Sequence, residues 1–213
     1  MMMARKMAPV ETNQAAKAVF ALDPGGKGAK AEKVRLRAEL RHRMEVIPAD
    51  LRSTTRWKAV NHLRTLVAEL APTVVALYSA RGAEIDVSML AADLWADGQT
   101  VALPRVVQRG HPLVFNVWPP HGALEPDVMG MLAATGPEIV PAVLVVPMVG
   151  YARSGYRLGY GGGFYDRTLA SFGQPVVTVG VCYTELEIKD FPAERHDRKL
   201  DYIVTGKEVI VCQ

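Results

Sequence analysis

The chain has 213 residues, of which 49% are hydrophobic and 22% charged, and its formal net charge is +3. This length suits one α/β domain with a packed core rather than two domains, and the composition excludes a disordered or fibrous chain. The small positive charge favours anionic small molecules as ligands and does not by itself indicate nucleic acid.

Membrane spans, disulfides and a secretory signal are not expected. The longest apolar run, PAVLVVPMVGY, has the length of a strand, whereas spanning a bilayer takes about 20 residues. Cys182 and Cys212 lie far apart without metal-binding spacing, so we expect reduced thiols. We therefore predict a cytoplasmic protein with no membrane partner. Residues 1–30 are expected to form a mobile tail, and residues 31–213 one domain.

Two helices are expected to open the domain. Residues 31–46 carry Leu36, Leu40 and Met44 four residues apart, which places them on one helical face surrounded by arginines. Pro48 interrupts this helix. The second helix is expected from near Ser53 until Pro72 stops it, with a core face made by Trp57, Val60, His62 or Leu63, Leu66, Val67 and Leu70.

Strands and helices then alternate. Asp86 is the expected N-cap of a helix that ends at Gly98, and residues 119–141 show no strong periodicity and are expected to wrap the surface. Apolar, β-branched runs predict strands at 73–80, 100–106, 113–118, 142–147, 175–182, 202–205 and 208–212. This alternation predicts a single three-layer α/β/α domain with a mostly parallel, mixed sheet, whose ligand site lies at the carboxyl ends of the strands.

The stretch RLGYGGGFYDR, residues 157–167, places four glycines between a strand and a helix expected to begin near Phe164. Ordered glycine costs roughly 0.5–1 kcal/mol relative to alanine in regular structure, so the cluster marks a slack turn or a close approach of backbone to a ligand. Glycine N–H groups and a helix N-terminus form an anion site, to which Arg157 and Arg167 add positive charge. This arrangement of N–H groups and arginines suits a triphosphate better than a bare carboxylate. The glycine spacing matches neither the dinucleotide fingerprint nor the P-loop.

Asp166 lies in the first turn of the expected helix, where the helix dipole favours a carboxylate and where it could also bind Mg²⁺. Such a site needs a second carboxylate, and HDRKLD supplies Asp197 and Asp201. The sequence leaves the choice between these two open. His196, beside Asp197, is the one histidine that we consider as an orienting group.

Together these segments resemble the 5-formyltetrahydrofolate cyclo-ligase family, also called methenyltetrahydrofolate synthetases. The likeness covers about residues 33–205 and rests on the glycine stretch with KVRLR, AEIDV, LPRV, HDRKLD and YIVT. It implies a NagB/RpiA/CoA-transferase-like α/β fold and ATP- and Mg²⁺-dependent closure of 5-formyltetrahydrofolate to 5,10-methenyltetrahydrofolate. In this reaction the formyl oxygen is phosphorylated, and ADP and phosphate are released. We expect a monomer without a nucleic-acid partner.

The resemblance also implies site residues. Arg157 and Tyr160 are implied as catalytic, and Asp166 and Asp197 as metal ligands. ATP binding is implied for Lys33, Val34, Arg35, Leu36, Arg37, Arg157, Leu158, Gly159, Tyr160, Gly161, Gly162, Gly163, Phe164 and Tyr165. Binding of the folate substrate is implied for Ser79, Glu84, Trp118, Tyr160, Gly161, Gly162, Gly163 and Phe164. Lys33 and Arg37 are four residues apart, so both should project from one helical face.

Two departures from the family pattern keep an alternative open. Family members usually have Phe-Asp where this chain has Tyr151-Ala152, and Gly-Ile-x-Glu-Pro where it reads GMLAA at 130–134. Together with the basic N-terminal tail, these departures motivate the alternative of a divergent, non-catalytic folate- or RNA-associated binding protein.

Overall fold

The computed structural model of the protein describes residues 27–189 and 191–212. The prediction of a mobile tail concerns mainly residues 1–26, which lie outside the described residues. Residues 27–30, which the sequence assigned to the tail, are helical, because α1 (Lys27–Val46) begins at Lys27. The sequence KGAKAEK that opens this helix is rich in lysine and alanine and contains a glutamate, and these residues are good helix formers.

The first two helices meet at Pro48. Leu40 and Met44 of α1 are buried, as their spacing predicted. α2 (Ala49–Leu70) begins before the expected Ser53, because Pro48 stands at the N-cap, where its missing N–H breaks no helical hydrogen bond. Among the described residues, none of the helices combines the length and the apolar character needed to cross a membrane.

The core face of α2 is largely as predicted. Val60, Leu63, Leu66 and Val67 are buried, but the expectation for Trp57 was wrong, since this side chain is 64% exposed. The helical period instead directs Thr55 and Ala59 inward.

A seven-stranded sheet in the order β11-β10-β9-β6-β1-β2-β3 forms the middle of the domain. The five inner strands run parallel, and the edge strands β3 and β11 run antiparallel to their neighbours. The prediction of a mostly parallel, mixed sheet is therefore confirmed. The strands are β1 (Val74–Ala76), β2 (Thr100–Arg105), β3 (Val114–Val117), β6 (Val143–Pro147), β9 (Val177–Val181), β10 (Tyr202–Val204) and β11 (Val209–Val211).

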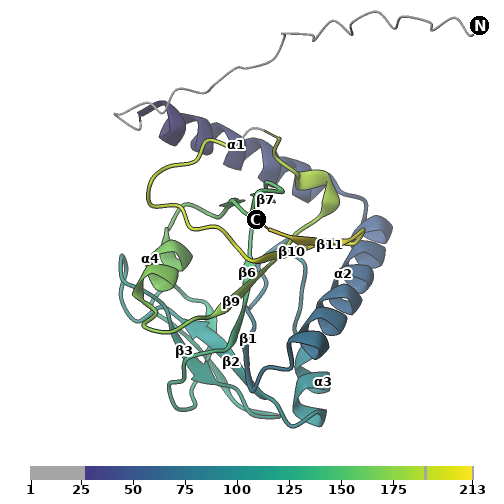
Figure 1. The fold of residues 1–213 in the computed structure, drawn as a ribbon, viewed down its shortest axis with the longest axis vertical. Helices are drawn as coiled ribbons and strands as arrows, with labels where there is room; N and C mark the ends of the chain where they lie inside the picture. The colour runs from purple at the N-terminus through teal and green to yellow at the C-terminus, as the bar shows by residue number, and fades with distance from the viewer. Residues whose placement is uncertain (1–26, 190, 213) are drawn as a thin grey trace, which may run out of the picture.

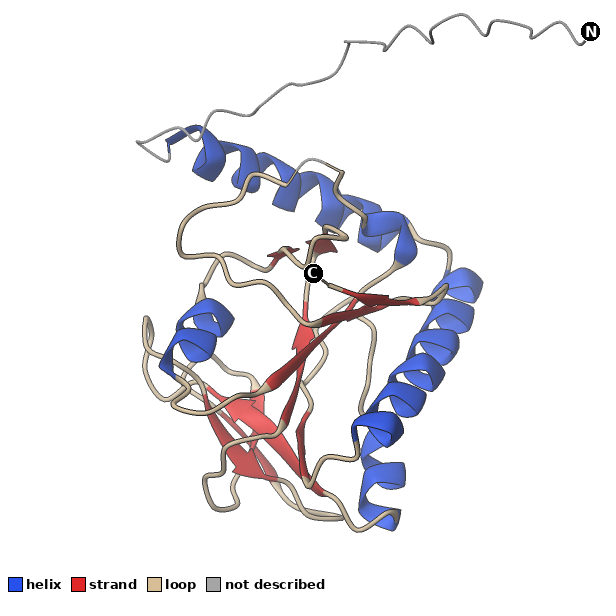
Figure 2. Ribbon diagram, viewed as in Figure 1, coloured by secondary structure: helices blue, strands red, loops and turns tan. Residues whose placement is uncertain are grey.

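Helices cover the sheet on both sides. Figure 1 shows α2 and α3 (Leu90–Ala96) on one side and α4 (Phe164–Ser171) on the other, while α1 crosses above the sheet. A short 3₁₀ helix, η1 (Thr184–Leu186), follows β9. Figure 2 shows the same arrangement by element type, with helices on either side of the strands and above them. The expected N-cap at Asp86 was wrong, because its carboxylate accepts the Ser88 N–H and the helix begins only after Met89.

Two short hairpins were not predicted. β4 (Leu124–Pro126) and β5 (Leu132–Ala134) lie within the segment expected to have no regular structure. This expectation was wrong because β5 buries its alanines and packs beside β2. β7 (Gly150–Tyr151) and β8 (Arg157–Leu158) lie between β6 and the glycines that begin at Gly159. Strands this short carry too few residues to show a period.

Candidate functional site

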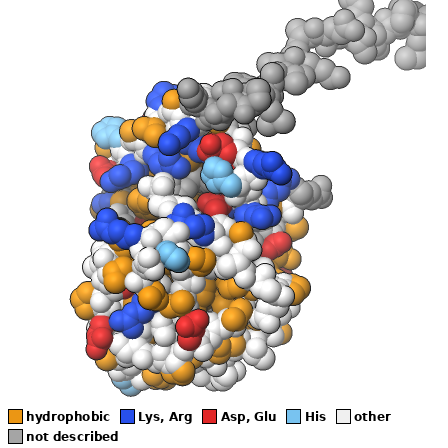
Figure 3. Space-filling view, turned by 90° about the vertical axis from the view of Figure 1, so that its left-hand side faces the viewer, with side chains coloured by type: hydrophobic (Ala, Val, Ile, Leu, Met, Phe, Trp, Pro, Cys, Tyr) orange, Lys and Arg blue, Asp and Glu red, His pale blue; other side chains and the backbone are white. Residues whose placement is uncertain are grey.

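A cleft of ≈ 480 Å³ lies at the carboxyl ends of the parallel strands, below α1. Ser79 after β1, Pro104 in β2 and Pro147 at the end of β6 contribute to its lining. The glycine stretch, the β4–β5 hairpin and residues 194–197 complete it. In the view of Figure 3, basic side chains gather on the upper part of the face and hydrophobic ones on the lower part. The cleft occupies the position expected for a ligand in an open α/β sheet.

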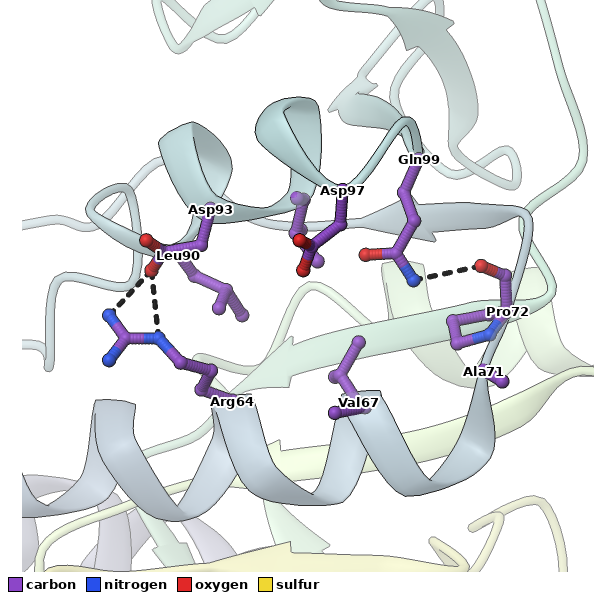
Figure 4. Close-up of a pocket in the computed structure, with 10 residues that line it drawn as sticks. Arg64, Val67, Ala71, Pro72, Leu90, Asp93, Asp97 and Gln99 are labelled. Atoms are coloured by element: carbon purple, nitrogen blue, oxygen red, sulfur yellow. Dashed lines mark hydrogen bonds and ion pairs between the residues drawn. The ribbon is translucent and has the colours of Figure 1, made fainter.

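A second hollow lies between α2 and α3, away from the glycine stretch (Figure 4). Arg64 of α2 forms an ion pair with Asp93 of α3, and the Gln99 amide donates a hydrogen bond of 2.9 Å to the Pro72 carbonyl. These polar groups tie the elements of the protein to one another. We therefore place the candidate site in the larger cleft, where the residues singled out from the sequence converge.

The glycine loop, residues 159–163, adopts a backbone that side chains disfavour. Gly161 has φ +96° and Gly163 has φ +64°. The Arg37 Nε donates a hydrogen bond of 2.9 Å to the Gly159 carbonyl, which ties the loop to α1. α4 begins directly after Gly163, so its N-terminal N–H groups and the loop face the same cleft. This geometry fits an anion.

Arg157 is the central cation of this region. It is 8% exposed. Its Nη2 donates to Asp166 Oδ1 at 2.7 Å, and its Nη1 donates to the Arg198 carbonyl at 2.7 Å. Asp166 also accepts the Arg198 N–H at 3.2 Å. One guanidinium therefore connects β8, the first turn of α4 and the segment that carries Asp197.

Lys33 contacts the same segment through two carboxylates. It is 4% exposed, and its Nζ lies 2.7 Å from Glu194 Oε2 and 2.6 Å from Asp197 Oδ2. Asp197 also accepts the Glu194 N–H at 2.7 Å. Asp201, the other carboxylate considered from the sequence, instead accepts hydrogen bonds from the backbone and hydroxyl of Thr178. The structure thus brings Asp197 to the cleft and uses Asp201 to join β9 to β10.

The carboxylates suit a magnesium ion. Asp166 and Asp197 line the same cleft. Ligand atoms of Glu194, His196 and Asp197 all lie within 4.8 Å of one another. Carboxylate oxygens are the ligands that Mg²⁺ prefers, usually with phosphate oxygens and water completing the shell. His196 is exposed and its Nε2 lies 4.0 Å from Glu194 Oε2, so it contacts the cluster from the solvent side.

Glu84 and Tyr160 both line the cleft and interact with each other. Burial raises the pKa of the Glu84 carboxyl, against the opposing effect of hydrogen bonds from the Arg81 N–H and the Tyr160 hydroxyl. Burial and the Glu84 charge raise the pKa of Tyr160, so its hydroxyl stays protonated and acts as a donor. The Arg41 guanidinium lies 5.9 Å from the centre of the Tyr160 ring. Tyr160 thus links the glycine loop to α1 and to the loop after β1.

Most of the implied site residues line the cleft, but four do not. The lining includes Lys33, Arg37, Ser79, Glu84, Arg157, Leu158, Gly159, Tyr160, Gly161, Gly162, Gly163, Phe164, Tyr165, Asp166 and Asp197. Val34 and Arg35 are exposed on the outer side of α1, where Arg35 pairs with Glu32 and Glu39. Leu36 packs against the core. Trp118 packs edge-to-face on Trp95, with 5.0 Å between ring centroids. The helical period brings only every third or fourth residue of α1 to the cleft.

The sequence analysis missed one wall of the cleft. Asp127, Met129, Met131 and Leu132 of the β4–β5 hairpin all contribute to its lining. Asp127 with Gly130 three residues later was the available signal, because an aspartate that starts a turn and a glycine that ends it favour a tight turn. Glu194 was also missed, since nothing in its sequence neighbourhood indicates that it meets Lys33.

The two departures from the family pattern occupy different places. Tyr151 and Ala152 are 1% and 4% exposed and belong to the buried core rather than to the lining of the cleft. Of the GMLAA segment, Met131 and Leu132 line the cleft, and Ala133 and Ala134 are fully buried. Only the second departure therefore alters the walls of the site.

Sequence comparison finds named relatives over most of the chain. A 5-formyltetrahydrofolate cyclo-ligase of Haemophilus influenzae is 28% identical over 182 residues, covering 80% of this chain and 97% of the relative. The enzyme of the same name from Saccharomyces cerevisiae is 26% identical over 202 residues, covering 83% of this chain and 96% of the relative. These relatives are ligases, so the chain is similar to enzymes along nearly their full length.

Solved structures agree with this similarity. A 5,10-methenyltetrahydrofolate synthetase from Aquifex aeolicus superposes with a TM-score of 0.74 at 25% identity, covering 85% of this chain and 93% of the other. One from Mycoplasma pneumoniae gives 0.69 at 20% identity, with 82% and 99% covered, and supports the fold alone. The family model of the 5-formyltetrahydrofolate cyclo-ligases matches residues 29–206. The chain belongs to the 5-formyltetrahydrofolate cyclo-ligase family and is a ligase.

Proposed function

We propose that this protein converts 5-formyltetrahydrofolate and ATP to 5,10-methenyltetrahydrofolate, ADP and phosphate, with Mg²⁺ as the metal. Family membership supports the folate substrate and its product. One observation carries the proposal: cations, a glycine loop and carboxylates suited to a metal converge on a single cleft. Such a set serves the transfer of a phosphoryl group.

The reaction takes two steps. The formyl oxygen attacks the γ-phosphorus, the bond to the β–γ bridging oxygen breaks, and ADP leaves. N10 of the folate then attacks the activated carbon, the carbon–oxygen bond to phosphate breaks, phosphate leaves, and N10 loses its proton. An amide oxygen is a poor nucleophile, so the protein must align it with the phosphorus and stabilise the negative charge of the transferring group.

We assign the phosphate half of the site to Lys33, Arg37, Arg157 and the glycine loop. Mg²⁺ would be held by Asp166 and Asp197, with Glu194 beside Asp197, and would draw negative charge from the phosphates. Lys33 pairs with both Glu194 and Asp197 in this structure. A metal at those carboxylates would free the ammonium of Lys33 to pair with phosphate oxygens.

We assign the folate half to Glu84, Tyr160 and the apolar side of the cleft. The Glu84 carboxylate can accept hydrogen bonds from the amino and ring N–H groups of the pterin. The Tyr160 hydroxyl, which donates to Glu84, can orient that carboxylate toward the pterin. Ser79, by contrast, uses its hydroxyl to donate to the Leu132 carbonyl at 2.7 Å, so it supports the wall of the cleft.

The methenyl product absorbs in the near ultraviolet, which gives a direct assay. Purified protein with 5-formyltetrahydrofolate, ATP and Mg²⁺ should produce this absorbance together with one ADP per product. Omitting ATP or adding a chelator should abolish both signals. The absence of product from folded protein, beside an active control enzyme, would reject the proposal.

The non-catalytic alternative has less support. The relatives that match 80% or more of the chain are named as ligases. Both departures leave the cations and the carboxylates of the cleft in place. Binding of folate without release of ADP would be the result that favours the alternative.

A further inference from the structure

We propose that Asp127 is a positioning residue that sets the apolar wall on which the ring system of the folate lies. The inference rests on the proposed function and deepens it, because it assigns a determinant for one of the two substrates. We define the hairpin wall as Met129, Met131 and Leu132, which all line the cleft. Asp127 stands at the start of the turn that carries them.

The carboxylate of Asp127 organises this turn. Its Oδ1 accepts the N–H groups of Met129 at 2.7 Å and Met131 at 3.0 Å. The Asp127 N–H donates to the Met131 carbonyl at 2.8 Å, and the Gly130 N–H donates to the Asp127 carbonyl at 2.9 Å. Gly130 has φ +74°, the left-handed conformation in which such a turn ends. One side chain therefore fixes the backbone of the whole tip.

The same carboxylate fastens the tip to the sheet. Its Oδ2 accepts the N–H of Val106, just after β2, at 2.9 Å. Ser79, after β1, supplies a second attachment through its hydrogen bond to the Leu132 carbonyl. A hairpin with strands of three residues is not stable on its own. The buried alanines of β5 pack the base of the hairpin beside β2, and these two hydrogen-bonded attachments hold its tip relative to the carboxyl ends of β1 and β2.

The hairpin wall suits a ring system rather than a nucleotide phosphate. Its side chains are apolar, and Met129 and Leu132 are 36% and 50% exposed, which leaves apolar surface open to a ligand. The cations Lys33, Arg37 and Arg157 belong to α1 and β8, not to this wall. Flexible methionine side chains adapt well to the face of an aromatic ring. Glu84 supplies a polar partner for the edge of the same ring.

The two halves of the cleft should therefore respond to different substitutions. In Asp127→Ala three N–H groups lose their acceptor and the turn loses its attachment to β2. We expect the KM for 5-formyltetrahydrofolate to rise about tenfold, because the apolar wall is no longer held in place before binding. The KM for ATP should change less than about twofold, since no cation of the phosphate half touches Asp127. Calorimetric titration with 5-formyltetrahydrofolate alone should show the same loss of affinity.

Two further variants refine the test. Asp127→Asn keeps one carbonyl oxygen for the turn but cannot accept the Val106 N–H with its amide nitrogen. We therefore expect it to raise the KM for 5-formyltetrahydrofolate less than Asp127→Ala does. Met129→Ser removes apolar surface from the wall without touching the carboxylate, and it should also raise the KM for the folate alone. If Asp127→Ala does not fold, these two variants decide the outcome. The matched control is Asp86→Asn, because Asp86 also accepts a backbone N–H in a turn but lies outside the cleft lining.

The possible outcomes separate the inference from the proposed function. A rise in the folate KM alone, absent from Asp86→Asn, supports the role of Asp127. The role of Asp127 is overturned if Asp127→Ala raises both KM values equally, or if it leaves the folate KM unchanged. Provided that the wild-type protein turns over normally, either result leaves the proposed function intact. A folded wild-type protein that neither binds nor converts 5-formyltetrahydrofolate overturns both.

Discussion

Lys33 and Asp197, 164 residues apart in the sequence, form an ion pair with 2.6 Å between Nζ and Oδ2. Lys33 also contacts Glu194 and is almost completely buried. This contact holds α1, whose residues are implied to bind ATP, against residues 194–197, which include the implied metal ligand Asp197. The contact is present without any ligand. This relationship links the stability of the fold to the chemistry of the site.

Removing the charge of Lys33 should destabilise the protein. In Lys33→Met two carboxylates lose their cation in a poorly solvated place, and we expect a loss of about 3 kcal/mol in the free energy of unfolding. Urea unfolding followed by circular dichroism measures this loss. Arg35→Gln is the matched control, because Arg35 lies two residues away with its side chain 61% exposed, and its unfolding midpoint should stay unchanged. A Lys33→Met protein as stable as wild type would show that the pair contributes nothing.

Activity should require the guanidinium of Arg157 and not only its positive charge. Arg157→Lys keeps the charge, but an ammonium cannot donate to Asp166 and the Arg198 carbonyl in the fixed geometry of a guanidinium. We expect kcat to fall about 100-fold with the fold retained, as for the loss of a group that stabilises the transition state. Steady-state kinetics with a circular dichroism check measures this effect. Arg153→Lys, which changes an exposed arginine paired with Glu208, should keep full activity.

The two candidate carboxylates of HDRKLD should behave differently. Asp197→Asn should raise the Mg²⁺ concentration needed for half-maximal activity by about tenfold, as should Asp166→Asn, because a neutral amide is a poorer ligand. Asp201→Ala should leave the Mg²⁺ requirement unchanged and cost about 1 kcal/mol of stability, through the lost hydrogen bonds to Thr178. Mg²⁺ titrations of activity and unfolding curves compare them. A shifted Mg²⁺ requirement in Asp201→Ala would reverse the assignment.

Glu84 should make stability depend on pH. Burial raises the pKa of this carboxyl in the folded protein above its usual value of 4.5. The folded state therefore holds the proton more tightly than the unfolded state, so the contribution of Glu84 to stability is present below its usual pKa and is lost as the pH rises through the folded-state pKa.

Glu84→Gln removes this titration and keeps an oxygen that accepts the Arg81 N–H. The variant should be as stable as wild type at acidic pH and more stable at neutral pH, while its affinity for the folate falls. Thermal unfolding from pH 4 to pH 7 measures the difference. Parallel curves for the two proteins across that range would contradict the role of burial at Glu84.

Some features of this protein follow from the sequence alone, because they depend on neighbours in the chain. The apolar run of β6 predicts a buried strand, and the spacing of Leu40 and Met44 predicts the inner face of α1. The glycine loop is recognisable because positive φ angles need glycine and an anion needs N–H groups. The same helical period explains why Lys33 and Arg37 face one cleft.

Other features were decided only by the tertiary structure. Residue types and spacing leave Asp197 and Asp201 as equals, and only the family resemblance favours Asp197. In the structure Asp201 accepts hydrogen bonds from Thr178 of β9, while the loop before β10 carries Asp197 to Lys33. The β4–β5 hairpin could not be predicted from the sequence, because its strands are too short to show a period. Hydrogen bonds from Val106 to Asp127 and from Ser79 to the Leu132 carbonyl attach it to the ends of β2 and β1. Local propensity acts over a few residues, whereas these contacts join residues brought together only by the order of the strands.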